Sequence, residues 1–158
     1  MKLHFSMRYG YVVSALVCSM MFAAAGCTSP VITAAEPGAT DKDAPKKFTT
    51  TASGLQYRIL RKSKGKKPTA ADTVTVHYRG WLDDKKEFDS SYQRDKPSTF
   101  PLRGVIKGWT EGLQLVGVGG MIELKIPAKL GYGDKGVGDG LIPGGATLHF
   151  LIEVLEVK

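Results

Sequence analysis

Cysteine is almost absent from this chain of 158 residues. The two cysteines are Cys18 and Cys27, so residues 28–158 contain none. The part of the chain after Cys27 must therefore be stable without disulfide bonds and cannot carry out thiol chemistry.

Histidines and the common catalytic motifs are also scarce. The three histidines are His4, His77 and His149, and no two of them have the spacing of zinc ligands. There is no G-x-S-x-G motif for a serine nucleophile, and no P-loop or dinucleotide-binding glycine motif. Asp134–Gly140 lacks the spacing of a calcium loop, and we expect it to form the mobile tip of a glycine-rich flap. We therefore expect neither a metal nor a cofactor.

Long hydrophobic runs are limited to one. From Tyr11 to Ala25 there are 15 residues without a charge, fewer than the ~20 that a spanning helix needs. Lys2 and Arg8 precede this run, and small residues end it. The order is typical of a signal peptide, which we assign to residues 1–26. An uncleaved N-terminal anchor helix is the alternative.

Cys27 follows Ala-Ala-Gly, which resembles a bacterial lipobox, in which the cysteine is lipidated and becomes the first residue of the mature protein. Ala24 stands where such motifs usually have leucine. Ordinary cleavage after Ala25, leaving a free thiol, is the alternative. We predict cleavage before Cys27 and a membrane-anchored lipoprotein of the cell envelope that faces the periplasm. Thr28, in place of an aspartate, suits the outer membrane of a Gram-negative organism.

Positive charge exceeds negative charge. The net charge is +7, and removal of the predicted signal peptide leaves 20 basic and 15 acidic residues. Six of the basic residues lie within Arg58–Lys67. Such a cluster can face nucleic acid or anionic lipid headgroups, or can simply be a solvated loop. The segment has no interleaved exposed aromatics for base stacking, so we expect no nucleic-acid partner.

The composition changes near Phe48. The preceding residues are rich in Ala, Thr, Pro and charge and show no apolar periodicity, so residues 27–47 are predicted to be a flexible linker. From Phe48 onward, apolar and polar residues alternate in four segments, at 55–59, 74–78, 122–126 and 148–154. This pattern predicts antiparallel strands with one buried face each, within a single domain over residues 48–158.

One segment has a helical period instead. Ile106, Trp109, Leu113 and Val116 recur at spacings of three and four, and Gly117 follows them. An antiparallel sheet closing over one short amphipathic helix is the architecture we expect, an α+β fold. On this pattern, His77 and His149 point to the face of the sheet opposite the apolar residues.

Five motifs occur in order and allow a comparison with a known family. They are V-H-Y-R-G-W-L (76–82), F-D-S-S-Y (88–92), F-P-L-R-G-V-I-K-G-W-T-E-G-L (100–113), G-Y-G-D (131–134) and I-P-G-G-A-T-L-H-F (142–150). Together they resemble the FKBP-type peptidyl-prolyl cis-trans isomerases, the macrolide-binding immunophilins. The resemblance covers Phe48 to Lys158. It implies a half-barrel of antiparallel strands wrapped around the short helix, with an apolar cleft between them.

The resemblance also implies which residues line the cleft. They are Tyr78, Phe88, Asp89, Phe100, Val105, Ile106, Trp109, Tyr132, Ile142 and Phe150. Trp109 is expected to form the floor on which a proline ring rests. The N–H of Ile106 and the hydroxyl of Tyr132 are expected to donate hydrogen bonds to carbonyls of the bound peptide.

The implied function is cis-trans isomerisation of X–Pro bonds in exported proteins, without a cofactor. The implied partners are proline-containing polypeptides, with macrolides as further ligands. A monomer is expected, since only a linker precedes the domain. The rival interpretation is a binding module that acts as a chaperone without being an enzyme, because a fold does not determine an activity. A chaperone role accompanying the isomerase activity is a further expectation.

Overall fold

Residues 35–158 are described by the computed structural model, and the predicted signal peptide, Cys27 and the first part of the predicted linker lie outside this range. Within residues 35–158, no helix is long and apolar enough to cross a membrane. All the strands and the helix described below belong to one unit, Thr33–Lys158.

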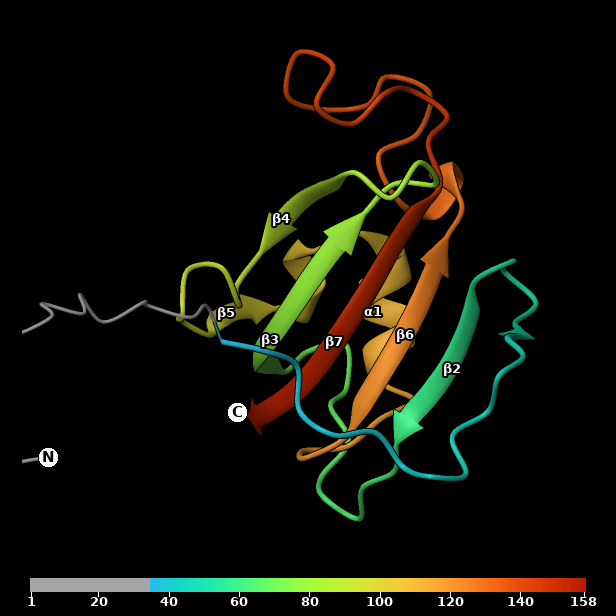
Figure 1. The fold of residues 1–158 in the computed structure, drawn as a ribbon. Helices are drawn as coiled ribbons and strands as arrows, with labels where there is room; N and C mark the ends of the chain where they lie inside the picture. The colour runs from blue at the N-terminus through green and yellow to red at the C-terminus, as the bar shows by residue number, and fades with distance from the viewer. Residues whose placement is uncertain (1–34) are drawn as a thin grey trace, which may run out of the picture. The chain divides into compact units, whose positions relative to one another are not determined.

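Seven antiparallel strands of the described residues form one sheet (Figure 1). They are β1 (Thr49–Thr50), β2 (Gln56–Arg61), β3 (Thr73–Trp81), β4 (Glu87–Ser90), β5 (Ser98–Pro101), β6 (Met121–Ile126) and β7 (Leu148–Val157). Their order is β1-β2-β6-β7-β3-β4, and β5 pairs with β3. The helix α1 (Lys107–Leu113) lies between β5 and β6 in the chain. The 3-10 turn η1 (Leu102–Gly104) precedes α1, and the 3-10 turn η2 (Ala128–Leu130) follows β6.

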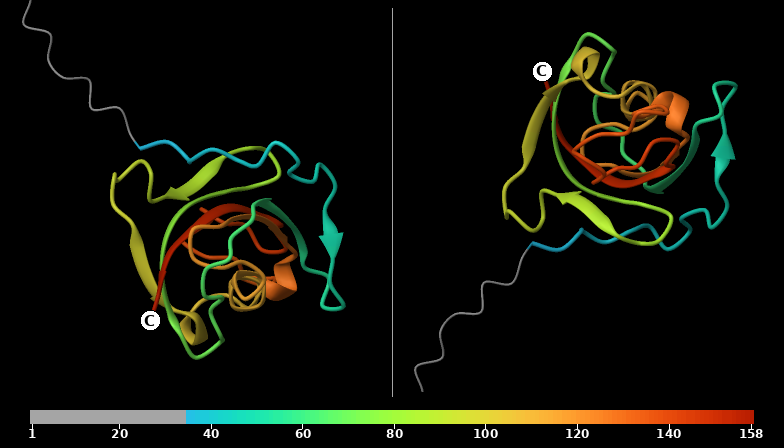
Figure 2. Two further views of the ribbon diagram at one scale, coloured as in Figure 1. Left: turned by 90° about the horizontal axis from the view of Figure 1, so that it is seen from below. Right: turned by 90° about the horizontal axis from the view of Figure 1, so that it is seen from above.

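The sheet curves around α1, as the two end-on views show (Figure 2). The pairing shifts register in β2, in β3 opposite β7, and in β3 opposite β4. Such irregularities bend a strand and increase its twist. The expected α+β half-barrel around one helix is therefore confirmed.

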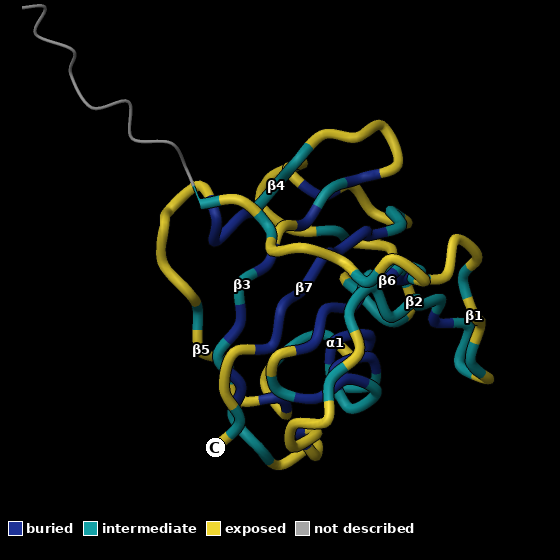
Figure 3. Tube along the Cα trace, turned by 60° about the horizontal axis from the view of Figure 1, so that its bottom comes forward, coloured by how far each residue is buried: buried dark blue, intermediate teal, exposed yellow. Residues whose placement is uncertain are grey.

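The inner face of the sheet holds the core, and it follows the alternation predicted for β3 and β6. Val74 and Val76 of β3 and Leu124 of β6 are completely buried, while their neighbours in sequence are only partly so. In Figure 3 the buried stretches follow β3 and β7 and continue into the segment around α1. Burial of these side chains against Leu113 of α1 gives the sheet one fixed inner face.

The helix is shorter than the predicted stripe. It begins after Ile106, which has extended backbone angles (φ −59°, ψ 147°), and ends at Leu113, so Val116 is buried by the following turn. Two glycines on one side of α1 set its distance from β6. A β-carbon at Gly108 would stand 2.5 Å from Ile126, and one at Gly112 would stand 2.7 Å from Leu124. The glycines therefore let the helix backbone lie directly against the sheet.

Strand β7 differs from the expectation of one buried face. Every residue from Leu148 to Val154 is buried, including His149 and Glu153 on the outer side. Segments distant in sequence cover that side: Tyr92 donates a hydrogen bond of 2.6 Å to Glu153, and Trp81 stacks on His149. The prediction of a sheet covered on one side is therefore wrong for β7, because alternation in one strand does not report loops that cover its other face.

Residues 38–46, here called the N-terminal strap, lie on the domain. The Gly38 N–H donates to the Glu153 carboxylate at 2.7 Å, and the Asp41 N–H donates to the Leu60 carbonyl at 2.8 Å. The second bond uses a carbonyl of β2 beyond the two residues, Gln56 and Tyr57, that pair with β1, so the strap protects a part of β2 that β1 leaves uncovered. This part of the expected flexible linker is therefore fastened to the sheet, which differs from the prediction.

Candidate functional site

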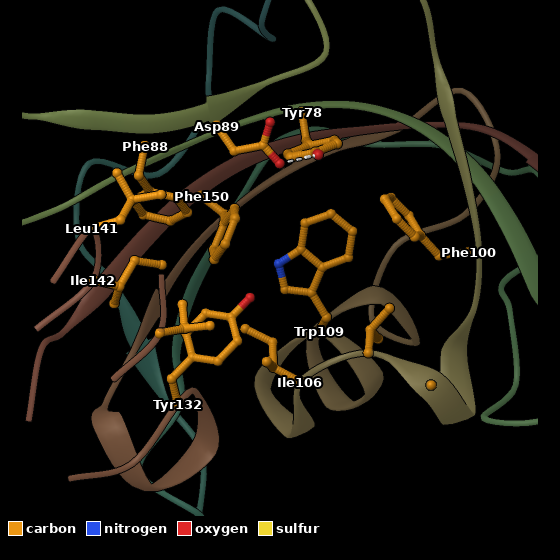
Figure 4. A pocket seen from close by; sticks show the side chains of 13 residues that line it. Tyr78, Phe88, Asp89, Phe100, Ile106, Trp109, Tyr132, Leu141, Ile142 and Phe150 are labelled. Carbon is orange, nitrogen blue, oxygen red and sulfur yellow. Dashed lines mark hydrogen bonds between the residues drawn. The ribbon is translucent and has the colours of Figure 1, made fainter. Parts of the chain in front are cut away.

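The ten residues that the sequence singled out line one cavity of about 490 Å³. The cavity lies on the inner side of the sheet at the N-terminal end of α1 (Figure 4). Gly104, Val137 and Leu141 complete its lining. Their assembly depends on the tertiary structure, because the lining comes from β3, β4, β5, β7, the segment around α1, and the loop between β6 and β7.

Trp109 forms the floor of the cavity and is 3% exposed. The rings of Tyr78, Phe100 and Phe150 surround it at centroid distances of 5.2, 5.6 and 5.2 Å. Their planes make angles of 83°, 88° and 84° with the indole. Such edge-to-face contacts are favourable and hold the rings in place. The result is an apolar box with a flat base and upright walls, a shape that fits a small saturated ring.

Gly80 makes room for two of the aromatic walls. In the β3–β7 pairing it lies opposite Phe150, and the Phe88 ring approaches it from β4. A β-carbon at this position would stand 2.6 Å from a ring atom of each phenylalanine. The two rings pack edge to face with centroids 5.5 Å apart. The absence of a side chain at Gly80 therefore allows this wall to form.

The polar edge of the cavity is organised around Asp89. One oxygen of its carboxylate accepts a hydrogen bond from the Tyr78 hydroxyl, and the other pairs with Arg94 at 2.5 Å. Arg94 also donates to the Tyr78 hydroxyl at 3.1 Å. Burial, together with the hydrogen bond to Asp89, raises the pKa of Tyr78, so its hydroxyl stays protonated near neutral pH. Sequence reasoning missed Arg94, whose only signal was its position five residues after Asp89.

Two hydrogen-bond donors lie at the mouth of the cavity. Figure 4 shows the Tyr132 hydroxyl pointing toward the indole of Trp109. Partial burial and the negative charge of Asp89 raise the pKa of Tyr132, which keeps the donor proton in place. The Ile106 carbonyl accepts the first helical bonds, from Trp109 at 2.9 Å and from the next residue. Within residues 35–158 the Ile106 N–H makes no hydrogen bond, so it is free to donate to a ligand.

Residues 131–145, here called the flap, form one side of the mouth. Val137 and Ile142 exchange two backbone hydrogen bonds of 2.9 and 3.1 Å, which fold the flap back on itself. Gly136 sits at the crossing with φ +67°, and a β-carbon there would stand 2.1 Å from the Ile142 carbonyl oxygen. Ile142 is buried, while Val137 and Leu141 are 44% and 45% exposed. Sequence reasoning missed these last two residues, although apolar residues in a glycine-rich run were a signal.

The two histidines of the domain point away from the cavity. His77 stacks on Tyr92 and makes a hydrogen bond of 3.0 Å with Ser91. His149 makes a hydrogen bond of 2.7 Å with Asp83. Neither lines the cavity, which agrees with their predicted place on the outer face. Among residues 35–158, no group of three or more His, Cys, Asp and Glu side chains is placed to hold a metal ion.

The sequence model of the family described as FKBP-type peptidyl-prolyl cis-trans isomerase matches residues 64–155. The chain is 50% identical over 109 residues to FKBP-type peptidyl-prolyl cis-trans isomerase FkpA of Escherichia coli, covering 69% of this chain and 40% of the relative. It is 52% identical over 113 residues to a probable FKBP-type isomerase of Haemophilus influenzae, covering 72% and 46%. The chain thus spans less than half the length of these relatives.

Solved structures show the same likeness. The crystal structure of FkpA from Escherichia coli matches with a TM-score of 0.69 and 48% identity, over 72% of this chain and 53% of that one. The crystal structure of AtFKBP13 matches with a TM-score of 0.65 and 35% identity, over 71% of this chain and 99% of that one. The second match covers nearly all of the AtFKBP13 chain, so the likeness extends over a whole domain.

Proposed function

Because this chain belongs to the family of FKBP-type peptidyl-prolyl cis-trans isomerases, we propose that its aromatic cavity accelerates rotation about X–Pro bonds in polypeptides. The observation that carries the proposal is the perpendicular arrangement of three rings around the buried indole of Trp109. The box is apolar and fits a pyrrolidine ring. It has two donors at its mouth, and the buried indole N–H of Trp109 at its floor has no hydrogen-bond partner among residues 35–158.

The chemistry needs no nucleophile. Rotation about an X–Pro bond is slow because it breaks amide resonance, with a barrier of about 20 kcal/mol. Resonance places negative charge on the carbonyl oxygen, and water stabilises that charge in the planar ground state. An apolar cavity withdraws this solvation and favours the twisted amide, in which the charge is smaller. Lowering the barrier by ~7 kcal/mol corresponds to an acceleration of roughly 10⁵-fold.

Each group of residues then has a role. The proline ring rests on Trp109, and Phe88, Phe100 and Phe150 hold it by shape. The Ile106 N–H and the Tyr132 hydroxyl donate to peptide carbonyls on either side of the twisting bond, which fixes the rest of the substrate while one bond rotates. Asp89, held by Tyr78 and Arg94, shapes the polar edge of the cavity. We propose that macrolides bind in the same cavity as further ligands.

We propose in addition that the mature protein is a lipoprotein of the cell envelope, anchored through acylated Cys27, monomeric, and facing the periplasm. The signal-peptide pattern that ends at a lipobox-like sequence supports this location. The substrates would then be exported polypeptides as they fold.

Binding of unfolded chains, as a chaperone, is the second candidate function. Three of the four large apolar residues that the described part of the chain exposes, Tyr132, Val137 and Leu141, stand together at the cavity. An apolar rim of this kind can hold extended segments beside the proline.

A protease-coupled isomerisation assay with a short X–Pro peptide tests the main proposal. Acceleration of the slow phase in proportion to protein concentration is expected, and Trp109→Leu should abolish most of it. A folded protein that leaves the slow phase unchanged, yet suppresses aggregation of an unfolded protein, would reverse the order of the two candidates.

A further inference from the structure

The loop that follows β2 concentrates positive charge at one end of the domain. Residues 62–67, here called the basic loop, carry four exposed lysines: Lys62, Lys64, Lys66 and Lys67. No acidic residue occurs from Arg58 to Ala71. Lys62 pairs with Asp43 at 2.8 Å, but both side chains are largely exposed, and Lys66 lies 3.9 Å from Asp72. Asp41 also accepts a hydrogen bond of 2.8 Å from the Lys62 N–H. Exposed pairs of this kind are weak, and Lys64 and Lys67 have no carboxylate partner among residues 35–158.

The backbone of the basic loop is held in one conformation. Val118 donates a hydrogen bond of 3.0 Å to the Lys66 carbonyl, and the Ser63 hydroxyl bonds the Val118 carbonyl. Gly65 and Gly117 are in close contact: a β-carbon at Gly117 would stand 2.2 Å from the Gly65 carbonyl oxygen. The four lysines are therefore presented from a fixed base.

A cavity of about 190 Å³ opens beside these lysines. Lys62 and Lys67 stand at its polar side, and the partly exposed Ile59 and Leu115 form its apolar wall, with the buried Val116 behind them. The cavity thus offers cations next to an apolar surface. This combination suits an amphipathic anion whose phosphate is joined to an apolar body. It lacks the aromatic rings on which nucleic-acid bases stack.

The basic loop and the aromatic cavity lie at opposite ends of α1. Ile106 and Trp109, at the N-terminal end, line the aromatic cavity, whereas Leu115 and Val116, beyond the C-terminal end, line the small one. In Figure 1 the loop after β2 lies at the bottom of the domain and the flap at the top. A surface in contact with the basic loop would therefore leave the aromatic cavity open.

The N-terminal strap meets the domain beside the basic loop. The Arg61 guanidinium donates to the Ala39 carbonyl of the strap and to the Gly119 carbonyl, each at 2.9 Å. Arg61 immediately precedes the loop, and Gly119 follows the Val118 that holds it. The N-terminal strap thus contacts the domain next to the basic loop.

We propose that the basic loop and its cavity dock the domain on an anionic phospholipid surface. The lysines contact headgroup phosphates, and the apolar wall of the cavity contacts the glycerol and the first acyl carbons. Attraction of this kind grows with each basic residue near the surface and weakens with salt. The inference is independent of the isomerase activity, and it places the aromatic cavity away from the bilayer, toward soluble polypeptides.

Vesicle co-sedimentation tests the proposal, with residues 33–158 as the protein, because they contain all seven strands, α1 and the whole core. Vesicles of mixed phosphatidylglycerol and phosphatidylcholine should bind the domain at about 0.1 M NaCl and release it at about 0.5 M. Pure phosphatidylcholine should not bind it. The triple variant Lys64→Gln, Lys66→Gln, Lys67→Gln should bind on the order of a hundredfold more weakly.

The matched control has the same loss of charge elsewhere: Lys85→Gln, Lys86→Gln and Lys96→Gln, three exposed lysines around β4. It should bind nearly as well as the wild type, and both variants should keep wild-type isomerase activity toward a short peptide. Equal weakening in the two variants would mean that only net charge matters and would overturn the docking site. Binding to single-stranded nucleic acid but not to anionic vesicles would overturn it in favour of the nucleic-acid alternative.

Discussion

Gly80 lies directly across the β3–β7 pairing from Phe150, and a β-carbon on Gly80 would stand 2.6 Å from that ring. The pair shows how a backbone position controls the shape of the aromatic cavity. Gly80→Ala should displace the wall and lower kcat/KM by at least about tenfold, because small misplacements of a site are costly. Overpacking should also cost about 1–3 kcal/mol of unfolding free energy.

Gly104→Ala is the control for this substitution. Gly104 also lines the cavity, but the nearest atom to an added β-carbon is 3.5 Å away, an ordinary contact. It should leave kcat/KM and the thermal midpoint nearly unchanged. Wild-type activity in Gly80→Ala would show that the position of the Phe150 wall does not matter for catalysis.

Tyr132→Phe should lower kcat/KM by roughly two- to tenfold, the worth of one hydrogen bond of about 0.5–1.5 kcal/mol. The phenyl ring stays, so the apolar rim is preserved and the stability should change little. Peptide kinetics with the purified variant measure the effect. A loss above about a thousandfold would point to proton transfer by the hydroxyl, which the proposed mechanism does not contain.

The rate should be nearly independent of pH from about 6 to 8, the range in which an ordinary histidine changes charge. His77 and His149 lie outside the cavity, and the raised pKa of Tyr132 keeps its hydroxyl protonated throughout this range. His77→Ala should therefore leave the profile of kcat/KM against pH flat. A bell-shaped profile centred near pH 7 that disappears in His77→Ala would contradict the mechanism.

Glu153→Gln should loosen the N-terminal strap. Burial alone would raise the pKa of Glu153, but hydrogen bonds from Tyr92, Arg61 and Gly38 outweigh it and lower the pKa below its ordinary value. Because the pKa of Glu153 is lower in the folded state, its carboxylate stabilises the fold fully at pH values above its ordinary pKa of 4.5. This stabilisation is lost as the pH falls through the pKa of the folded state. At pH 7 the variant should lose about 2–3 kcal/mol, the worth of bonds to a buried charge.

Chemical denaturation at several pH values measures this effect. The difference between Glu153→Gln and the wild type should shrink below pH 4, and hydrogen exchange at the Gly38 amide should accelerate in the variant at pH 7. Glu156→Gln, at an exposed carboxylate that pairs with Lys158, is the control and should change stability by less than about 1 kcal/mol. Equal effects of the two substitutions would remove the buried network as the cause.

Cys27→Ser should release the protein from the membrane fraction or leave its precursor unprocessed. The reason is that acylation of this residue is the proposed anchor, and a single acyl chain holds only marginally, so the mature form should carry more than one. Fractionation of cells that express either form measures the result. Finding wild type and variant equally soluble would reject the lipoprotein proposal.

Much of the fold and site could be predicted from the sequence. The alternation in β3 and β6 identified their buried faces, because period-2 burial is a local property of a strand. The resemblance carried by the five motifs implied ten of the thirteen residues that line the cavity, from Tyr78 to Phe150. These residues are recognisable because the site needs particular side chains at particular positions, with no contribution from a metal or cofactor.

Only the tertiary structure showed what covers the outer face of β7. Its buried His149, Leu151 and Glu153 follow a pattern that predicts solvent exposure, and the segments that cover them are 50 or more residues away in sequence. The tertiary structure alone also placed three further residues at the site: Arg94, Val137 and Leu141. Hydrogen bonds between distant segments depend on how the chain closes around α1, and no local periodicity carries that information.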